Sequence, residues 1–232
     1  MKKWHLALLI STVIIADQTL KFYIKLNYHL NDSSSVFGKW FHLYFVENPG
    51  MAYGLKFGGD LGKLFLTVFR MGAVVFGTWY LGRIIRYKYS KGFIICAGLI
   101  YAGAIGNLLD SCFYGLIFNK GMIYDPTLRE YLGYNGLASF AGKGYASFLH
   151  GNVVDMLYFP LIKGHFPAWL PVWGGDDFEF FRPIFNIADA SITLGVITIL
   201  LFQKSFLKNK RHVVSKQPEQ VNLQPGDISQ IS

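Results

Sequence analysis

The sequence predicts an all-α membrane protein with four transmembrane helices, a small extracytoplasmic β-sheet and a long extracytoplasmic loop insert. Composition is the first observation: 52% of the 232 residues are apolar and 16% are charged, whereas soluble domains have about 25% charged residues. The second observation is four apolar segments of roughly the 20 residues that a membrane-spanning helix needs. The third is the clustering of Lys and Arg next to alternate ends of these segments, which is typical of multi-pass membrane proteins.

The first apolar segment follows Lys2 and Lys3, as the core of a signal peptide would. It is long, lacks a small-x-small cleavage site and is followed by further spans, so we expect it to be retained as a helix. In the third segment Gly98, Ala102 and Gly106 recur on one stripe, which predicts close helix packing. The four spans are expected at about residues 4–24, 61–81, 92–113 and 184–204.

The first long connection carries a strand signal, and we expect a sheet at about residues 36–58. Residues 40–46 are aromatic and β-branched, as strands prefer. Asn48-Pro49-Gly50 suits a turn, with Pro at its second position and Gly at its third. Residues 51–57 are the expected return strand.

The remaining chain divides into a long loop and a polar tail. Residues 114–183 form the extracytoplasmic loop, and residues 1–211 together form the four-helix membrane domain. Residues 212–232 are polar, without apolar periodicity, so we expect a disordered cytoplasmic tail.

Basic residues orient the chain. The N-terminus, the loop over residues 83–91 and the start of the tail are rich in Lys and Arg. The positive-inside rule places these parts in the cytoplasm. Spans one and three then run outward, and spans two and four run inward.

With this orientation, four carboxylates are expected at one depth, just inside the extracytoplasmic surface. One of them is roughly 7 Å into its helix at 1.5 Å per residue. A charge within a membrane costs roughly 2.5–3.5 kcal/mol at the helix centre, so such residues indicate a functional site. The four are Asp17, Asp110, Asp155 and Asp189, with Asn107 and Asn186 three residues before two of them.

Three charged side chains near this layer have alternative interpretations. Asp17 and Lys21 are four residues apart on one helix face, and they form either a local ion pair or a support for the site. Arg70 is either a snorkelling side chain or the counter-ion of a buried acid.

The chemistry that the sequence offers is carboxylate chemistry. The six His are scattered, no Ser or Cys lies beside a His in the spans, and there is no phosphate-binding loop. Two carboxylates about 3 Å apart share a proton. The ionised one can take a proton from water while the other polarises a carbonyl, as in an aspartic peptidase. Depth alone leaves open whether Asp110 or Asp155 partners Asp189.

Five short motifs in this order resemble those of lipoprotein signal peptidase (signal peptidase II), over roughly residues 5–205. Each motif alone is weak evidence, and the order on four spans makes the resemblance strong. The motifs are Asp17-Gln18-Thr19-Leu20-Lys21, Asn48-Pro49-Gly50-Met51-Ala52-Tyr53, Gly103-Ala104-Ile105-Gly106-Asn107-Leu108-Leu109-Asp110, Val153-Val154-Asp155 and Phe185-Asn186-Ile187-Ala188-Asp189.

The resemblance implies a membrane aspartic endopeptidase that removes signal peptides from bacterial prolipoproteins, cutting before the cysteine that carries diacylglycerol. It implies that Asp155 and Asp189 are the catalytic pair. The other matched residues are a supporting polar set, Asn107, Asp110, Asn186, Asp17 and Lys21, and a substrate-binding set, Asn48, Gly50 and Ala52.

The expected partners follow from this resemblance. They are a lipid-modified prolipoprotein as substrate and the surrounding membrane lipids. We expect a monomer that needs no cofactor and no metal, and despite a net charge of +8 no nucleic-acid partner. The expected location is the bacterial cytoplasmic (inner) membrane, multi-pass, with both termini cytoplasmic and the active site on the extracytoplasmic side.

Two departures from the family pattern stand out. The family commonly has Arg after the acid that matches Asp110, where this chain has Ser111; Arg70 or Arg182 is the expected substitute. About 35 extra residues near 118–151 separate Asp110 from Asp155, and we expect them to form a helix or a lid.

Two other functions compete with a peptidase. Intramembrane acids often form proton relays, so a small proton-coupled transporter is one alternative. The other is a non-catalytic membrane assembly factor in which the acids only pair with basic residues.

Overall fold

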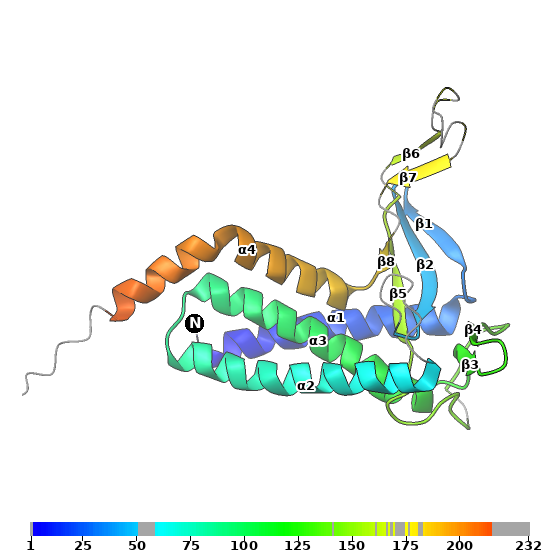
Figure 1. Cartoon of the computed structure of the whole chain (residues 1–232), viewed down its shortest axis with the longest axis horizontal. Helices are drawn as coiled ribbons and strands as arrows, with labels where there is room; N and C mark the ends of the chain where they lie inside the picture. The colour runs from blue at the N-terminus through cyan, green and yellow to red at the C-terminus, as the bar shows by residue number, and fades with distance from the viewer. Residues whose placement is uncertain are drawn as a thin grey trace, which may run out of the picture.

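The computed structural model contains a bundle of four long helices with strands at one end (Figure 1). It describes residues 2–50, 59–140, 142–160 and 183–214, and between them residues 162–165, 167, 169, 175 and 177–180. All four helices are long and apolar enough to cross a membrane, as the sequence predicts. They are α1 Lys3–Asn27, α2 Gly59–Arg86, α3 Lys91–Ile117 and α4 Ile187–Val214.

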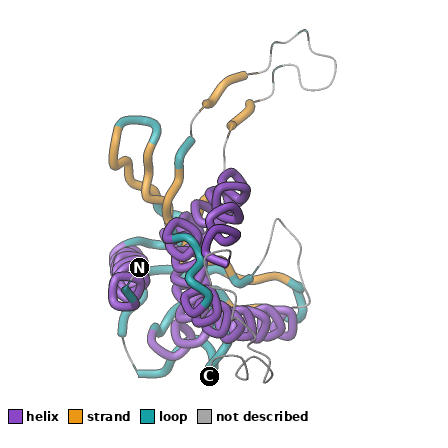
Figure 2. The backbone as a smooth tube through the Cα atoms, turned by 90° about the vertical axis from the view of Figure 1, so that its left-hand side faces the viewer, coloured by secondary structure: helices purple, strands orange, loops and turns teal. Residues whose placement is uncertain are grey.

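Helix α3 is the centre of the bundle and packs against the other three helices. Figure 2 shows the bundle from its end, with the helices in purple. The predicted small-residue stripe lies at these contacts, since a Cβ on Gly106 would come within 3.0 Å of both Asp17 on α1 and Ala188 on α4. At Gly103 a Cβ would lie 2.2 Å from the Ala188 carbonyl oxygen. Glycine is therefore required where α4 begins against α3.

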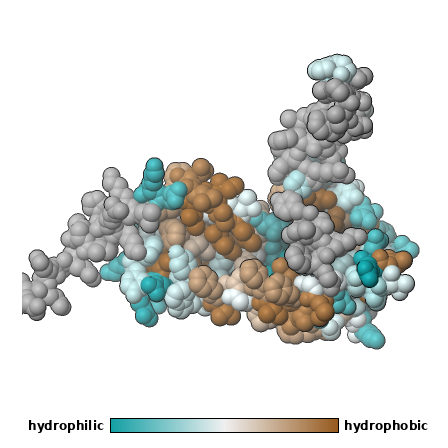
Figure 3. Space-filling model, in the orientation of Figure 1, coloured by the Kyte–Doolittle hydropathy of each residue, from teal (hydrophilic) through white to brown (hydrophobic). Residues whose placement is uncertain are grey.

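The outward faces of the helices are apolar. Figure 3 shows brown, hydrophobic side chains over α2 and α4 between more hydrophilic ends of the molecule. On α2 the exposed side chains include Phe65, Val75 and Phe76, each 60–71% accessible. A soluble monomer rarely exposes a contiguous apolar surface of this kind, whereas lipid requires one.

A four-stranded antiparallel sheet stands at one end of the bundle (Figure 1). The predicted strand over residues 40–46 is confirmed as part of β2. In β2 and β5, Val46 is the partner of Asp155, and β8 continues the sheet by pairing with β5. The strands, in the order β1-β2-β5-β8, are Ser33–Phe37, Phe41–Asn48, Val153–Tyr158 and Ile184–Phe185.

Sequence patterning did not identify β5 and β8 as partners of β2. Both strands come from what we expected to be loop or helix. The expected return strand at residues 51–57 lies outside the described residues.

Helix α4 begins later than predicted, at Ile187 rather than near residue 184. Ile184 pairs with Tyr158 and Phe185 pairs with Leu157 in the sheet. Their apolar side chains resemble the start of a span, but their backbone groups are used by β5. The helix therefore starts only after Asn186.

The insert at residues 118–151 forms a hairpin and irregular loops, and the expectation of a helix is wrong for its described residues. Strands β3, Ile123–Asp125, and β4, Glu130–Leu132, form the hairpin. A second hairpin further along joins β6, Ile162–His165, to β7, Asp177–Phe180. Repeated Gly and an Asp-Pro pair favour turns here rather than a helix.

The end of the insert runs back along α3. The N–H of Ala146 donates to the Gly115 carbonyl at 3.0 Å, and the N–H of Gly151 donates to the Ser111 carbonyl at 2.9 Å. A Cβ on Gly151 would lie 2.0 Å from the Asp110 carbonyl oxygen. This close backbone contact returns the chain to Asp110 immediately before β5, so the 35 extra residues do not displace Asp155.

Candidate active site

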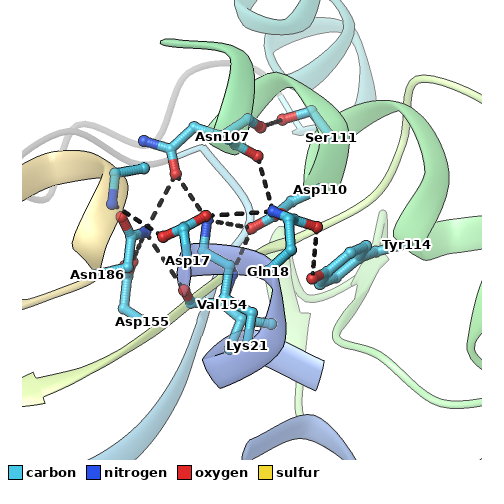
Figure 4. Close-up of polar contacts among 12 residues, drawn as sticks. Asp17, Gln18, Lys21, Asn107, Asp110, Ser111, Tyr114, Val154, Asp155 and Asn186 are labelled. Atoms are coloured by element: carbon cyan, nitrogen blue, oxygen red, sulfur yellow. Dashed lines mark hydrogen bonds and ion pairs between the residues drawn. The ribbon is translucent and has the colours of Figure 1, made fainter. Parts of the chain in front are cut away.

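The Lys21 ammonium group holds together the polar residues at the centre of the site. Lys21 and its partners are buried within the bundle. Its Nζ lies 2.8 Å from Asp17 and 2.8 Å from Asp110, and it donates to Asn107 Oδ1 at 3.0 Å. Figure 4 shows these side chains converging from α1 and α3. Lys21 therefore supports a larger site, and the alternative of an isolated local ion pair does not fit.

Asp17 and Asp110 also accept backbone N–H groups and so fix two backbone elements of the site. Asp17 Oδ1 accepts the Ala188 N–H at 2.8 Å, at the start of α4. Asp110 Oδ2 accepts the Val154 N–H at 3.2 Å, in β5. A carboxylate near a helix N-terminus is stabilised by the unpaired N–H groups there. These two acids thus position the elements that carry Asp155 and Asp189.

Asn186 and Asp189 form a reciprocal cap at the start of α4. The Asp189 N–H donates to Asn186 Oδ1 at 2.8 Å, and the Asn186 N–H donates to Asp189 Oδ2 at 3.4 Å. The Asn186 carbonyl accepts the Ala190 N–H at 3.0 Å. This is the arrangement of a capping box, with a carboxylate at the third helical position. The three-residue spacing seen in the sequence therefore reflects helix capping, which fixes the Asp189 carboxylate.

Two amide side chains link Asp155 to Asp189. Asn186 Nδ2 donates to Asp155 Oδ1 at 2.7 Å and to Asn107 Oδ1 at 3.1 Å. Asn107 Nδ2 in turn donates to Asp189 Oδ1 at 2.7 Å. These two carboxyls form no direct hydrogen bond with each other, and the two amides connect them.

Burial is the main cause that raises the pKa of Asp155 to about 8, and the charge of Asp189 is the second cause. Desolvation disfavours a charged carboxylate, and a second carboxylate nearby disfavours it further. Asp155 is only 6% exposed. Asp155 therefore keeps its proton to a higher pH than an ordinary carboxyl does.

Known proteins with similar sequences place this chain in a family. The family model described as Signal peptidase (SPase) II matches residues 9–205. The chain belongs to the signal peptidase II family. A lipoprotein signal peptidase of Porphyromonas gingivalis is 43% identical over 196 residues, which are 84% of this chain and 80% of that relative. One of Amoebophilus asiaticus is 30% identical over 210 residues, 89% of this chain and 80% of the relative.

A solved structure shows the same fold. A bacterial membrane enzyme determined by the in meso method superposes with a TM-score of 0.52 at 22% identity, covering 94% of this chain and 95% of the other. As a signal peptidase II, the protein is a peptidase of the inner membrane. It takes part in lipoprotein processing and removes signal peptides from prolipoproteins.

The signal peptidase II family commonly has Arg at the position of Ser111. In this chain the side chain of Arg70 contacts Ser111 instead. Its Nη1 donates to Ser111 Oγ at 2.8 Å, and Ser111 Oγ donates to the Asn107 carbonyl at 2.9 Å. Arg70 is close enough to interact electrostatically with Asp110 and Asp189. It therefore points into the bundle rather than snorkelling. The other expected substitute, Arg182, lies outside the described residues.

The residues expected to bind substrate lie at the end of β2. Asn48 Oδ1 accepts the Gly50 N–H at 2.9 Å. Gly50 has a φ of 103°, which glycine adopts readily and other residues rarely adopt. Ala52 lies outside the described residues. The predicted turn is therefore supported at Gly50.

Sequence reasoning missed Gln18, which lies within a quoted motif. Gln18 Nε2 donates to Asp110 Oδ1 at 2.8 Å and to the Gly106 carbonyl at 3.2 Å, and its Oε1 accepts from Tyr114 at 3.1 Å. A polar residue beside Asp17 in a span was the available signal.

A second buried polar cluster around Glu47 was also missed. Glu47 is ion-paired with Lys25 and accepts from Tyr134 at 2.8 Å, Asn152 at 2.7 Å and the Met122 N–H at 2.8 Å. Burial, and then Glu47, raises the pKa of Tyr134 above its usual range, so its hydroxyl remains a donor. Glu47 thus joins β2 to the insert, and its partner Asn152 lies three residues before Asp155. Lys25, one helical turn after Lys21, was the signal in the sequence.

Proposed function

We propose that this signal peptidase II is an aspartic endopeptidase in which Asp155 and Asp189 are the catalytic pair. Its substrate is a diacylglyceryl-modified prolipoprotein, which it cleaves immediately before the lipidated cysteine. One observation carries the proposal: β5 and α4 bring two carboxyls together through Asn186 and Asn107. The family membership supplies the substrate class.

In the proposed mechanism the two carboxyls have different roles. Asp189 lies at the N-terminus of α4 and accepts from Asn107 and the Asn186 N–H, so it is positioned as the general base. It takes a proton from a water molecule as that water attacks the scissile carbonyl carbon. Asp155, protonated at neutral pH, donates its proton to the carbonyl oxygen.

Collapse of the resulting tetrahedral intermediate breaks the C–N bond. The proton held by Asp189 passes to the leaving amine, and the proton on the intermediate returns to Asp155. One water is consumed, and the products are the signal peptide and the lipoprotein with its cysteine at the N-terminus. The direct attack by water leaves no covalent enzyme intermediate.

The proposed orientation puts the site on the extracytoplasmic side of the inner membrane. The site lies at the same end of the bundle as the sheet (Figure 1), while Lys and Arg gather at the opposite end. The positive-inside rule places that basic end, and both termini, in the cytoplasm. A scissile bond next to a lipidated cysteine would lie at the depth of these carboxyls.

The substrate would bind partly through Asn48 and Gly50 at the end of β2 and through Ala52, with its acyl chains in the surrounding lipid. Lipid contacts of this kind need no second subunit, so we propose a monomer.

The competing transporter function fits the charges less well. A proton relay needs titratable groups distributed through the membrane. Here the acids gather at one end, and no Asp or Glu occurs at residues 61–109 or 190–218. A purely structural role for the acids does not explain why Asp155 and Asp189 are linked by amides rather than by basic side chains.

The direct test uses purified protein and a diacylglyceryl-modified precursor in micelles. Mass spectrometry of the product should show a new N-terminus at the lipidated cysteine. The same precursor without its lipid should be cleaved at least tenfold more slowly. Equal rates on both precursors would contradict lipid recognition, and a cut elsewhere would contradict the proposed site of cleavage.

The chemistry is tested separately by adding hydroxylamine during turnover. A covalent acyl-enzyme would give a hydroxamate product, whereas direct attack by water gives only the free carboxylate. A hydroxamate in the product would overturn the aspartic mechanism.

A further inference from the structure

At the end of the bundle away from the carboxyls, basic side chains line a groove of about 510 Å³. We name it the basic groove, and its charged lining is Lys3 from α1 with Arg83 and Arg86 from α2. The ends of these two helices lie together at the left of Figure 1. The groove is far from the peptidase site and plays no part in the proposed mechanism.

Arg83 is held in place by two aromatic rings of the groove. Its guanidinium carbon lies 5.4 Å from the ring centroid of Trp79 and 5.4 Å from that of Tyr87. Such cation–π contacts use the face of the guanidinium group. Its N–H donors lie in the plane, in the fork geometry that matches a phosphate. The groove therefore presents an ordered donor group to an anion.

The charge in the groove has no nearby compensation. Of the ion pairs formed among the described residues, none includes Lys3, Arg83 or Arg86. The sequence has no Asp or Glu at residues 1–16 or 61–109. Three cations thus converge on one concave surface, and no carboxylate of the described residues forms an ion pair with them.

The surroundings of the groove indicate which kind of anion would fit it. Along α2 the groove is followed by exposed apolar side chains, with Val75 66% and Phe76 60% accessible. Trp and Tyr side chains prefer the level of lipid headgroups, and both Trp79 and Tyr87 line the groove. A ligand that matches both surfaces has a phosphate joined to acyl chains.

We propose that the basic groove binds the phosphate of an anionic phospholipid headgroup, with the acyl chains lying along α2. Basic pockets between transmembrane helices are suited to such headgroups. In the proposed orientation the lipid belongs to the cytoplasmic leaflet. The proposal does not depend on peptidase activity.

The test measures phosphatidylglycerol binding to the full-length protein in phosphatidylcholine nanodiscs, by counting retained lipids in native mass spectra. The variant Arg83→Gln/Arg86→Gln removes two cations from the groove. At about 1 kcal/mol for each cation, binding should weaken about 30-fold. The matched control Lys88→Gln/Lys91→Gln removes the same charge from the adjacent turn, outside the groove lining, and should change binding less than about threefold.

Equal losses in the two double variants would overturn the proposal, because they would show a general charge effect. A second arm adds inorganic phosphate to phosphatidylcholine nanodiscs. Saturation of the groove by phosphate, with no preference for phosphatidylglycerol, would identify a free-anion site and overturn the lipid assignment. All four positions are exposed, so the variants should fold, and cleavage of a lipidated precursor in phosphatidylcholine should be unchanged.

Discussion

Replacing Lys21 by methionine tests whether the buried charges hold the site together. Methionine keeps most of the volume of the side chain and removes its ammonium group, so the change leaves little cavity. Asp17 and Asp110, at 2.8 Å each, then lose their common cation while remaining inside the bundle.

The size of the effect follows from burial. Lys21 and Asp110 are fully buried, and Asp17 is 1% exposed. Removing one partner of a buried ion pair costs about 3–5 kcal/mol, because a buried charge is left uncompensated. We expect the free energy of unfolding of Lys21→Met to fall by at least this amount. Asn107 also loses a hydrogen bond, so cleavage should fall as well.

The assay is reversible unfolding by SDS in mixed micelles, followed by circular dichroism. Exposed Lys39 provides the matched control, and Lys39→Met should lie within about 0.5 kcal/mol of the parent. Asp17, Lys21 and Asp110 together carry a net charge of −1 in the parent protein. The double variant Lys21→Met/Asp110→Asn has the same net charge at these three positions. That double variant should recover more than half of the lost stability, since contacting residues are not additive.

A loss below about 1 kcal/mol in Lys21→Met would refute the reasoning. So would a double variant whose loss equals the sum of the two single losses, because the charges would then act independently.

Three further predictions follow from the site. Because burial and Asp189 raise the pKa of Asp155 to about 8 and the mechanism needs its proton, kcat/KM should fall as the pH rises through about 8; a fall beginning near pH 4 would contradict this. Arg70→Met, which loses the contact with Ser111, should lower kcat at least tenfold, with Arg70→Lys intermediate; parent activity in Arg70→Met would remove Arg70 from the site. Glu47→Gln should cost about 3–5 kcal/mol of stability, because it removes one partner of a buried ion pair. It should also speed proteolytic cutting within residues 118–151. Unchanged cutting would mean that Glu47 does not hold the insert.

The helices and the grouping of acids could be predicted from sequence because both follow from burial in lipid. Apolar runs of span length identify the helices. The hydrogen bonds of Asp17 and Asp110 join the elements that carry these acids, and a common depth of the four in the membrane stays a prediction.

The sheet and the insert could not be predicted in the same way. The order β1-β2-β5-β8 joins strands more than 100 residues apart, and such pairing depends on register that no local pattern reveals. The short strand at Ile184 resembles the start of a helix because its residues are apolar. The contacts of Glu47 were not predictable because its partners come from distant parts of the chain, Lys25 on α1 and Tyr134 in the insert.

The central claim is that Asp155 and Asp189 carry out hydrolysis. The most direct measurement is single-turnover cleavage of a lipidated precursor by Asp155→Asn and Asp189→Asn, with exposed Asp32→Asn as control. We expect each of the first two variants to remain folded in the membrane and to lose at least 1,000-fold in rate, since general acid–base catalysis by one group contributes about 10²–10⁴-fold. The control should cleave at the parent rate. Parent-like cleavage by either Asp155→Asn or Asp189→Asn would contradict the claim.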